Sequence, residues 1–295
     1  MIRVGTSGYS FSDWVGIVYP AGAKPGDFLS HYARLFDTVE INATYYRIPS
    51  PATFHSMLRK VPPSFTFVVK LPREMTHERE GFARAVVPFF AAVEPLAEAG
   101  QLGGLLAQFP YSFKPEPESE EHLRRLAGEV GGRGVPVNVE VRHAAWSRDE
   151  TYALLRDLGL GFVNVDLPSL RDLPGPTGLV TSEVGYVRLH GRNSRAWWGK
   201  DERARYDYLY SERELEEWRP RIEETASNSR LCYVFANNCH LGQSVVNALQ
   251  LQARFQLPRP TLPTGATEEM FAHTAEVLAN AIHERIRMAR ERATT

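Results

Sequence analysis

Only two of the 295 residues are cysteines, Cys232 and Cys239. They stand seven positions apart, a spacing that is not typical of metal ligands. So few thiols favour a reducing compartment, and we expect the chain to be cytoplasmic. Cys232 is expected to be a small buried apolar residue and Cys239 a free thiol.

The sequence also lacks an excess of charge of either sign, and it lacks long apolar runs. Lysine and arginine together number 34 and aspartate and glutamate 35, so the formal net charge is −1. No overall positive field attracts nucleic acid, and such a partner would need a local basic patch. The longest apolar runs, such as Leu102–Phe109, are too short to cross a bilayer, so no membrane partner is expected.

What the sequence does contain is a recurring short apolar segment of the kind that forms buried strands. Most of these segments are rich in valine, isoleucine, leucine and phenylalanine, and glycine, proline or charged residues bound them. The predicted strands are Arg3–Thr6, Thr38–Thr44, Thr66–Leu71, Gly104–Gln108, Val135–Val141, Gly161–Val165, Gly185–Leu189 and Leu231–Ala236.

Stretches of helical character lie between these strands. Pro51 fits the first turn of a helix after Ser50, and Ser211 followed by acidic residues fits a helix N-terminus. The connection 167–183 is rich in proline and glycine, and it is predicted to be irregular. The predicted helices are Pro25–Phe36, Pro51–Lys60, Gly81–Ala99, Glu118–Gly128, Arg148–Leu158, Ser211–Ala226 and His240–Phe255.

Repeated alternation of strand and helix predicts a parallel sheet with crossover connections, and eight strands is the number of a (β/α)8 barrel. We therefore predict an α/β fold with a single (β/α)8 TIM barrel over residues 1–257. A doubly wound sheet is disfavoured, because Gly5-Thr6-Ser7-Gly8-Tyr9 lacks the third glycine of a dinucleotide-binding turn. Residues 258–295 are predicted to be an extension, helical over Glu268–Arg292, that packs on the barrel or forms a dimer contact. Monomer and homodimer therefore both stay open.

Polar and apolar residues alternate within most of the predicted strands. In a barrel, alternate residues point to the axis, and those near the C-terminal strand ends line the mouth where barrel enzymes bind substrates. The apolar residues should face the helices, so the polar ones are expected to converge on the axis. These charges must pair with one another, with water or with a ligand, and a self-sufficient ion-pair network is the structural alternative. The converging set is Glu40, Lys70, Glu140, Arg142, Asp166, Arg188 and His190, and by the same alternation the uncharged Gln108 and Asn164 are expected to face the axis.

The mixture of signs in this set favours an anionic ligand over a metal centre. Lys70, Arg142 and Arg188 are suited to orient and stabilise anionic charge. Protonated lysine and arginine cannot ligate a metal, and they repel one. No cofactor is expected, and a divalent metal is disfavoured. The candidate catalytic acids and bases, which would also be the ligands of any metal, are Glu40, Glu140, Asp166 and His190.

Loops at the strand ends supply further candidates for substrate binding. Asn237 and Asn238 follow the eighth strand, where barrel enzymes often hold phosphate on backbone N–H groups. The loop after the seventh strand is basic and aromatic. Its Arg192 suits phosphate and its Trp197 a stacked ring; alternatively, Trp197 and Tyr208 pack the loop on the barrel rim. The other candidates for substrate binding are Trp14, Tyr45 and Gln108.

Short motifs in a fixed order run from residue 2 to about residue 255. They include Val4-Gly5-Thr6-Ser7-Gly8-Tyr9, Thr38-Val39-Glu40-Ile41-Asn42, Phe67-Val68-Val69-Lys70, Val139-Glu140-Val141-Arg142-His143, Val187-Arg188-Leu189-His190-Gly191-Arg192 and Phe235-Ala236-Asn237-Asn238. In this order they resemble the YecE-like family, also called domain of unknown function 72. The resemblance implies a TIM barrel, and it implies no activity.

Three functions stay open at this point. The leading hypothesis is an enzyme, a hydrolase or a lyase, that acts on a small phosphate- or carboxylate-bearing substrate at the barrel mouth. The second is a non-catalytic binder of nucleic acid or a nucleotide that uses the Trp197 loop. The third, a metal-dependent phosphodiesterase, rests on fold analogy alone.

Overall fold

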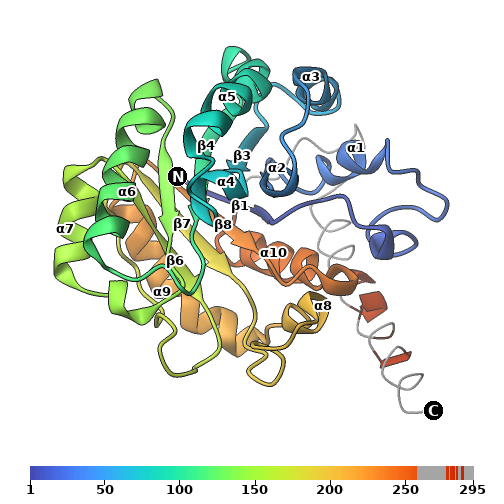
Figure 1. Ribbon diagram of the computed structural model, residues 1–295. Coiled ribbons are helices and arrows are strands. Elements are labelled where there is room, and N and C mark those ends of the chain that lie inside the picture. The colour runs from blue at the N-terminus through green and yellow to red at the C-terminus, as the bar shows by residue number, and fades with distance from the viewer. Residues whose placement is uncertain (258–276, 279, 283, 285–286, 289–295) are drawn as a thin grey trace.

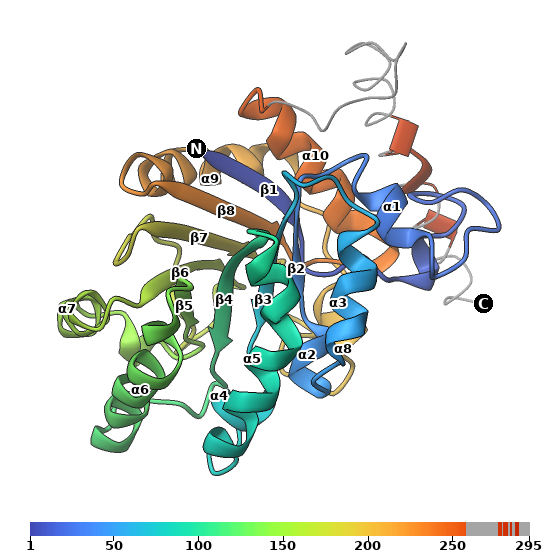
Figure 2. The ribbon, with the colours of Figure 1, turned by 90° about the horizontal axis from the view of Figure 1, so that it is seen from above.

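A computed structural model describes residues 1–257, 277–278, 280–282, 284 and 287–288, apart from the side chain of Glu202. Its parallel strands form one sheet in the order β1-β8-β7-β6-β5-β4-β3-β2. A single bridge between Ser7 and Glu40 joins the two outermost strands and nearly closes the ring (Figure 2). The predicted (β/α)8 barrel is therefore confirmed. The strands are β1 (Ile2–Thr6), β2 (Thr38–Ile41), β3 (Thr66–Lys70), β4 (Leu102–Gln108), β5 (Val137–Glu140), β6 (Gly161–Asp166), β7 (Val184–Leu189) and β8 (Leu231–Ala236).

Helices surround this ring of strands (Figures 1 and 2). In α9 the side chain of Ser211 accepts from the backbone N–H of Glu214, whose carboxylate bonds back to Ser211, a reciprocal cap that fixes the helix start. The connection from β6 to β7 is irregular, as predicted. The helices are α1 (Phe28–Tyr32), α2 (Ala43–Tyr46), α3 (Pro51–Leu58), α4 (Arg73–Thr76), α5 (Phe82–Glu98), α6 (Pro117–Glu129), α7 (Asp149–Asp157), α8 (Glu202–Arg205), α9 (Glu212–Ser227) and α10 (Gln243–Arg254).

Three predicted elements differ from the observed ones by three or more residues at an end, and the others by at most two. The strand predicted over Thr38–Thr44 ends at Ile41, because the chain turns there into α2. The helix predicted over Pro25–Phe36 shortens to the five residues of α1. The helix predicted from His240 begins at Gln243, because Gly242 has a φ of 83° that a helix cannot include.

The lower part of the barrel interior is an apolar plug. Burying an aliphatic or aromatic side chain of this size contributes roughly 1.5–3 kcal/mol, so the plug stabilises the ring from within. A polar layer lies above it, towards the C-terminal strand ends. The buried residues of the plug include Val68, Leu106, Val163, Val165, Tyr186, Tyr233 and Phe235.

The sixth strand is turned relative to the prediction. Val163 is paired with Tyr186 of β7 and Val165 with Arg188, so both valines face the axis. Asn164 and Asp166 therefore face outwards, and their predicted convergence on the axis is wrong. The reason is the irregular β6–β7 connection, whose backbone needs hydrogen-bond partners that a helix would not need. Asn164 supplies them, since its amide donates to the carbonyl of Leu179 and accepts from its N–H.

Part of the predicted C-terminal extension is described, and it lies against the barrel. Ile282 is fully buried beside Val246 of α10, and Leu278 is buried in the main core. The rest of the helix predicted over Glu268–Arg292 falls mostly outside the described residues. No helix among the described residues has the length and apolar character needed to cross a membrane.

Candidate functional site

Arg188 of β7 stands at the centre of the polar layer and joins carboxylates from two other strands. Its Nη1 lies 2.5 Å from Oε2 of Glu140, and its Nη2 lies 2.7 Å from Oε1 of Glu40. The three side chains are at most 1% exposed. A buried carboxylate needs a counter-charge, and Arg188 supplies it to both glutamates. The two ion pairs in turn hold the Arg188 side chain in one position across the barrel.

The Glu40 carboxylate has no free oxygen. The hydroxyl of Tyr186 donates to its Oε2 at 2.6 Å, and the amide of Asn42 donates to its Oε1 at 3.0 Å. Burial and the neighbouring Glu40 charge raise the pKa of Tyr186 well above its usual value. The phenol therefore stays protonated and donates to Glu40 at physiological pH.

Glu140 is the second anchor of the cluster. The Nε of Arg142 lies 2.5 Å from its Oε1, and the Nε2 of His190 lies 3.3 Å from the same oxygen. Burial alone would raise the pKa of Glu140, but Arg142, Arg188 and His190 together hold it well below the usual value. Glu140 is therefore an ionised structural anchor, which makes it a poor general acid.

His190 is fully buried, and it stays neutral at physiological pH. Burial and the nearby Arg142 lower its pKa to about 3. The side-chain amide nitrogen of Asn237 lies 2.8 Å from its Nδ1, so a bond donated by Asn237 leaves the ring proton on Nε2, facing Glu140. His190 was predicted to be a catalytic acid or base. Because its pKa lies far below neutrality, it is not poised to exchange a proton at neutral pH.

Lys70 of β3 is the group whose charge is poised near neutral pH. Its Nζ donates to Oε1 of Gln108 at 2.8 Å and lies 4.2 Å from the centre of the Tyr45 ring. Burial and the charge of Arg188 lower its pKa to about 7. The three residues, all predicted for substrate binding, lie together at the mouth.

A cavity of about 230 Å³ opens above this polar layer. Arg142 lies on its wall at 8% exposure, and its guanidinium carbon is 5.7 Å from the centre of the Trp197 ring. Arg205 approaches the same ring at 5.8 Å. The residues that line the cavity are His77, Gln108, Pro110, Tyr111, Arg142, Leu173, Trp197, Trp198, Arg205 and Tyr206.

Two of the predicted site residues form an ion pair away from this cluster. Asp166 faces outwards, and its Oδ2 accepts from the Nε of Arg192 at 2.9 Å. Arg192 also reaches Glu217 of α9 at 3.0 Å. Together the two contacts fasten the loop after β7 to β6 and α9, and they leave Arg192 with few donors for a phosphate.

Two further predicted residues have positions that serve the fold. Asn238 is fully buried and donates both to the carbonyl of Tyr208 and to the amide oxygen of Asn247, so it ties the loop after β7 to α10. Trp14 is fully buried and donates from Nε1 to the carbonyl of Cys239. Neither side chain lines the cavity.

Several residues on the cavity wall were missed by the alternation of the strands, because they lie on loops. Tyr111 lies three residues beyond β4, and His77 caps α4, the short helix that follows β3, so their place after a strand's C-terminal end was a usable signal. Trp198, Arg205 and Tyr206 belong to the connection after β7, where Arg205 ends the short helix α8, and the sequence of this connection is basic and aromatic. The backbone of a loop follows no regular repeat, so the sequence does not predict which of its side chains point into the cavity.

No group of three or more histidine, cysteine, aspartate or glutamate residues in the described part of the chain is arranged to hold a metal ion. Of the proposed ligands, Glu40 and Glu140 both face Arg188, and Asp166 lies outside the cluster. Cationic donors therefore occupy the carboxylates that a metal would need.

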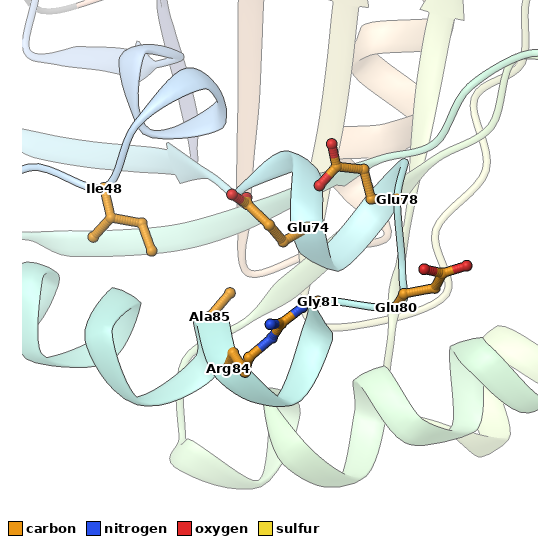
Figure 3. A pocket seen from close by; sticks show the side chains of 7 residues that line it. All are labelled: Ile48, Glu74, Glu78, Glu80, Gly81, Arg84 and Ala85. Atoms are coloured by element: carbon orange, nitrogen blue, oxygen red, sulfur yellow. The ribbon is translucent and has the colours of Figure 1, made fainter.

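A larger hollow, of about 520 Å³, lies outside the barrel between α4 and α5. Figure 3 shows Glu74 and Glu78 opposite Arg84 and Ala85, which lie in the first turn of α5, with Ile48 to one side. Its acidic groups lie partly or largely in water, where the low dielectric that strengthens charge–ligand contacts is absent. The barrel mouth is therefore the stronger candidate for chemistry.

Comparison with solved structures agrees with the barrel. A DUF72 family protein from Thermotoga maritima is 42% identical, with a TM-score of 0.80 over 87% of this chain and 99% of that one. A DUF72 family protein from Enterococcus faecalis is 23% identical, with a TM-score of 0.79 over 91% of this chain and all of that one (100%), which shows the shared fold.

Curated relatives carry names without an activity. UPF0759 protein YunF of Bacillus subtilis is 27% identical over 85% of this chain and 93% of its own length. UPF0759 protein YecE of Escherichia coli is 29% identical over 48% of this chain and 49% of its own length. A family model described as "protein of unknown function DUF72" matches residues 3–270. The chain therefore belongs to the DUF72 family.

Proposed function

We propose that this chain is an enzyme that acts on a small phosphate- or carboxylate-bearing substrate at the C-terminal mouth of the barrel. One observation carries the proposal: Arg142 on the cavity wall and Lys70 just behind it, bonded to the wall residue Gln108, keep unused hydrogen-bond donors. Lys70 makes one hydrogen bond, to Gln108, although a charged lysine has three donors. Arg142 meets Glu140 through Nε, and its terminal nitrogens bond to none of the described residues. Oxygens of an anion would satisfy these donors.

The balance of charge supports the same ligand. Arg142 and Arg188 pair with two buried carboxylates, Glu40 and Glu140, and Lys70 is a third cation close enough to feel their charge. His190 adds no charge at neutral pH, because its pKa is about 3. One positive charge is therefore in excess while Lys70 is protonated, and a bound anion would neutralise it in a site shielded from water.

Lys70 is the proposed proton carrier. A group with a pKa near the working pH can accept a proton in one step and return it in the next, and the pKa of Lys70 is about 7. The nearby Arg142 would hold the anionic group, and Arg188 would keep Glu140 in position behind it. Proton transfer of this kind serves both a hydrolase and a lyase.

A non-catalytic binder of nucleic acid or a nucleotide is the second candidate. Trp198 favours it, because this large ring is 57% exposed on the cavity rim and could stack on a base. Arg192 counts against it, since Asp166 and Glu217 already occupy its Nε and Nη1. Binding that falls steeply with added salt would support this candidate, whereas a flat salt profile would remove it.

A metal-dependent phosphodiesterase is the third hypothesis from the sequence, and it rests on fold analogy. Elemental analysis of the purified protein separates it from the leading proposal. A stoichiometric divalent metal that survives dialysis would favour the phosphodiesterase. Metal far below one ion per chain, together with activity that persists in chelator, would support the metal-independent enzyme.

A depletion screen tests the leading proposal. Purified protein is incubated with a small-molecule cell extract, and anionic metabolites are followed by mass spectrometry. The wild type should consume at least one of them, and both Lys70→Met and Arg142→Gln should leave it intact. Arg213→Gln, at a side chain 91% exposed on α9, is the matched control that should behave as wild type. If all four proteins give the same profile, the mouth is not an active site.

A further inference from the structure

Aromatic rings make up much of the cavity wall. Trp197, Trp198, Tyr111 and Tyr206 come from the loops after β7 and β4. The Trp198 and Tyr111 rings meet edge to face, with centroids 4.9 Å apart at an angle of 74°. Trp198 is 57% exposed beside the opening. An exposed ring of this size next to a cavity is a surface that a ligand can cover.

The polar groups of the cavity lie towards the barrel axis. Gln108 is the last residue of β4, and Arg142 lies two residues beyond the end of β5. Lys70 is bonded to Gln108 behind the wall. His77, also on the wall, has a pKa lowered to about 4 by burial and by Lys70, so it adds no charge at neutral pH. The cavity therefore has a cationic inner end and an aromatic outer end, where Arg205 lies beside the Trp197 ring.

The volume limits what such a ligand can be. Pockets for drug-sized ligands measure about 300–1,000 Å³, and this cavity measures about 230 Å³. A single ring with one anionic group fits that space, and a polymer or a dinucleotide exceeds it. Rings pack best on aromatic walls in offset or edge-to-face contacts, so the wall selects flat groups.

From these features we infer that the substrate of the proposed enzyme is a small anion with a flat ring. The anionic group lies on Arg142 and Lys70, and the ring lies against Trp198 and Tyr111. This inference rests on the proposed function, since it uses the same cavity and the same cations. It adds the substrate class and its orientation, with the anion inwards and the ring outwards.

Tryptophan fluorescence gives a direct readout of this site. Trp14, Trp146 and Trp218 are fully buried, and Trp197 is 4% exposed, so iodide quenching should report mainly on Trp198. The probes are phenylphosphonate, cyclohexylphosphonate and methylphosphonate, which share a head group and differ in the side group. Benzoate and acetate repeat the comparison with a carboxylate, and thereby show which anion the site prefers.

Phenylphosphonate should bind about tenfold more tightly than methylphosphonate and should protect Trp198 from iodide. Cyclohexylphosphonate, similar in size but not flat, should gain less. Trp198→Ala should remove the advantage of the phenyl group and keep the binding of methylphosphonate. Val87→Ala, at an apolar residue 70% exposed on the outer face of α5, should change neither.

The outcomes separate this inference from the proposed function. Equal affinity for the phenyl and methyl probes, a cyclohexyl probe that matches the phenyl probe, or a phenyl advantage that survives Trp198→Ala would each overturn the flat-ring inference and leave anion binding in place. If none of the five probes binds, the proposed function itself fails.

Discussion

The guanidinium of Arg188 and the carboxylate of Glu140 meet at 2.5 Å on the barrel axis, where neither side chain is more than 1% exposed. Glu40 faces the other terminal nitrogen of Arg188 at 2.7 Å. The ion cluster is therefore continuous across the barrel, from β2 through β7 to β5. Arg142 contacts this cluster through Glu140, and Lys70 lies near enough for its pKa to respond to the charges of the cluster.

Arg188→Met should strongly destabilise the protein. The change leaves two buried carboxylates without their shared cation, and breaking a buried pair in this way costs about 3–5 kcal/mol. Chemical denaturation of the wild type and the variant measures the loss. Arg213→Met removes an exposed partner of Glu217 and should cost less than about 1 kcal/mol. Similar midpoints for wild type and Arg188→Met would contradict the view of Arg188 as the central anchor.

Stability should depend on pH through Lys70. Its pKa is about 7 in the folded protein and near the ordinary 10.5 in the unfolded chain. Above pH 7 the unfolded chain therefore binds more protons, and the free energy of unfolding should rise with pH across this window. Below pH 7 the lysine is charged in both states, so the full penalty of its burial is present.

Lys70→Met removes this pH dependence. The difference in the free energy of unfolding between the wild type and the variant therefore measures the contribution of Lys70. Relative to the variant, the wild type should gain stability from pH 7 to pH 9.5 and should show no further change between pH 5.5 and 6. Urea denaturation at each pH provides the comparison. A difference that stays constant over the whole range would show that Lys70 keeps its ordinary pKa.

Asp166→Asn should loosen the loop after β7 without removing the anion site. Asp166 is the buried partner of Arg192, which also holds Glu217. Weakening this contact should speed tryptic cleavage in the loop, at Arg195 or Lys200, by several-fold. Glu183→Gln, which removes an exposed partner of Arg230, is the control. Unchanged cleavage together with lost anion binding would instead place Asp166 in the site.

Much of the polar layer was predictable from the alternation of polar and apolar residues within each strand. Glu40, Lys70 and Glu140 each alternate with apolar residues that must face the helices, so their place inside the barrel followed from the sequence. The barrel itself was predictable from a second pattern, because strand and helix alternate along the chain. Neither inference needed a knowledge of the loops.

The sixth strand shows where this reasoning stops. Period two divides Val163 and Val165 from Asn164 and Asp166, but it does not say which pair faces the axis. The usual rule fails there because an irregular connection covers the outer face and binds Asn164. The depressed pKa of His190 was equally hidden, since it depends on Arg142 and on complete burial.

The central claim is that Arg142 and Lys70 hold an anion, and calorimetric titration of inorganic phosphate at pH 6.5 tests it most directly. The wild type should bind phosphate with one site per chain, and Arg142→Gln and Lys70→Met should each weaken binding at least about tenfold while both variants stay folded. Binding by the wild type should also weaken above pH 7, as Lys70 loses its charge. Equal phosphate affinity in the three folded proteins, or no binding to any of them, would contradict the account.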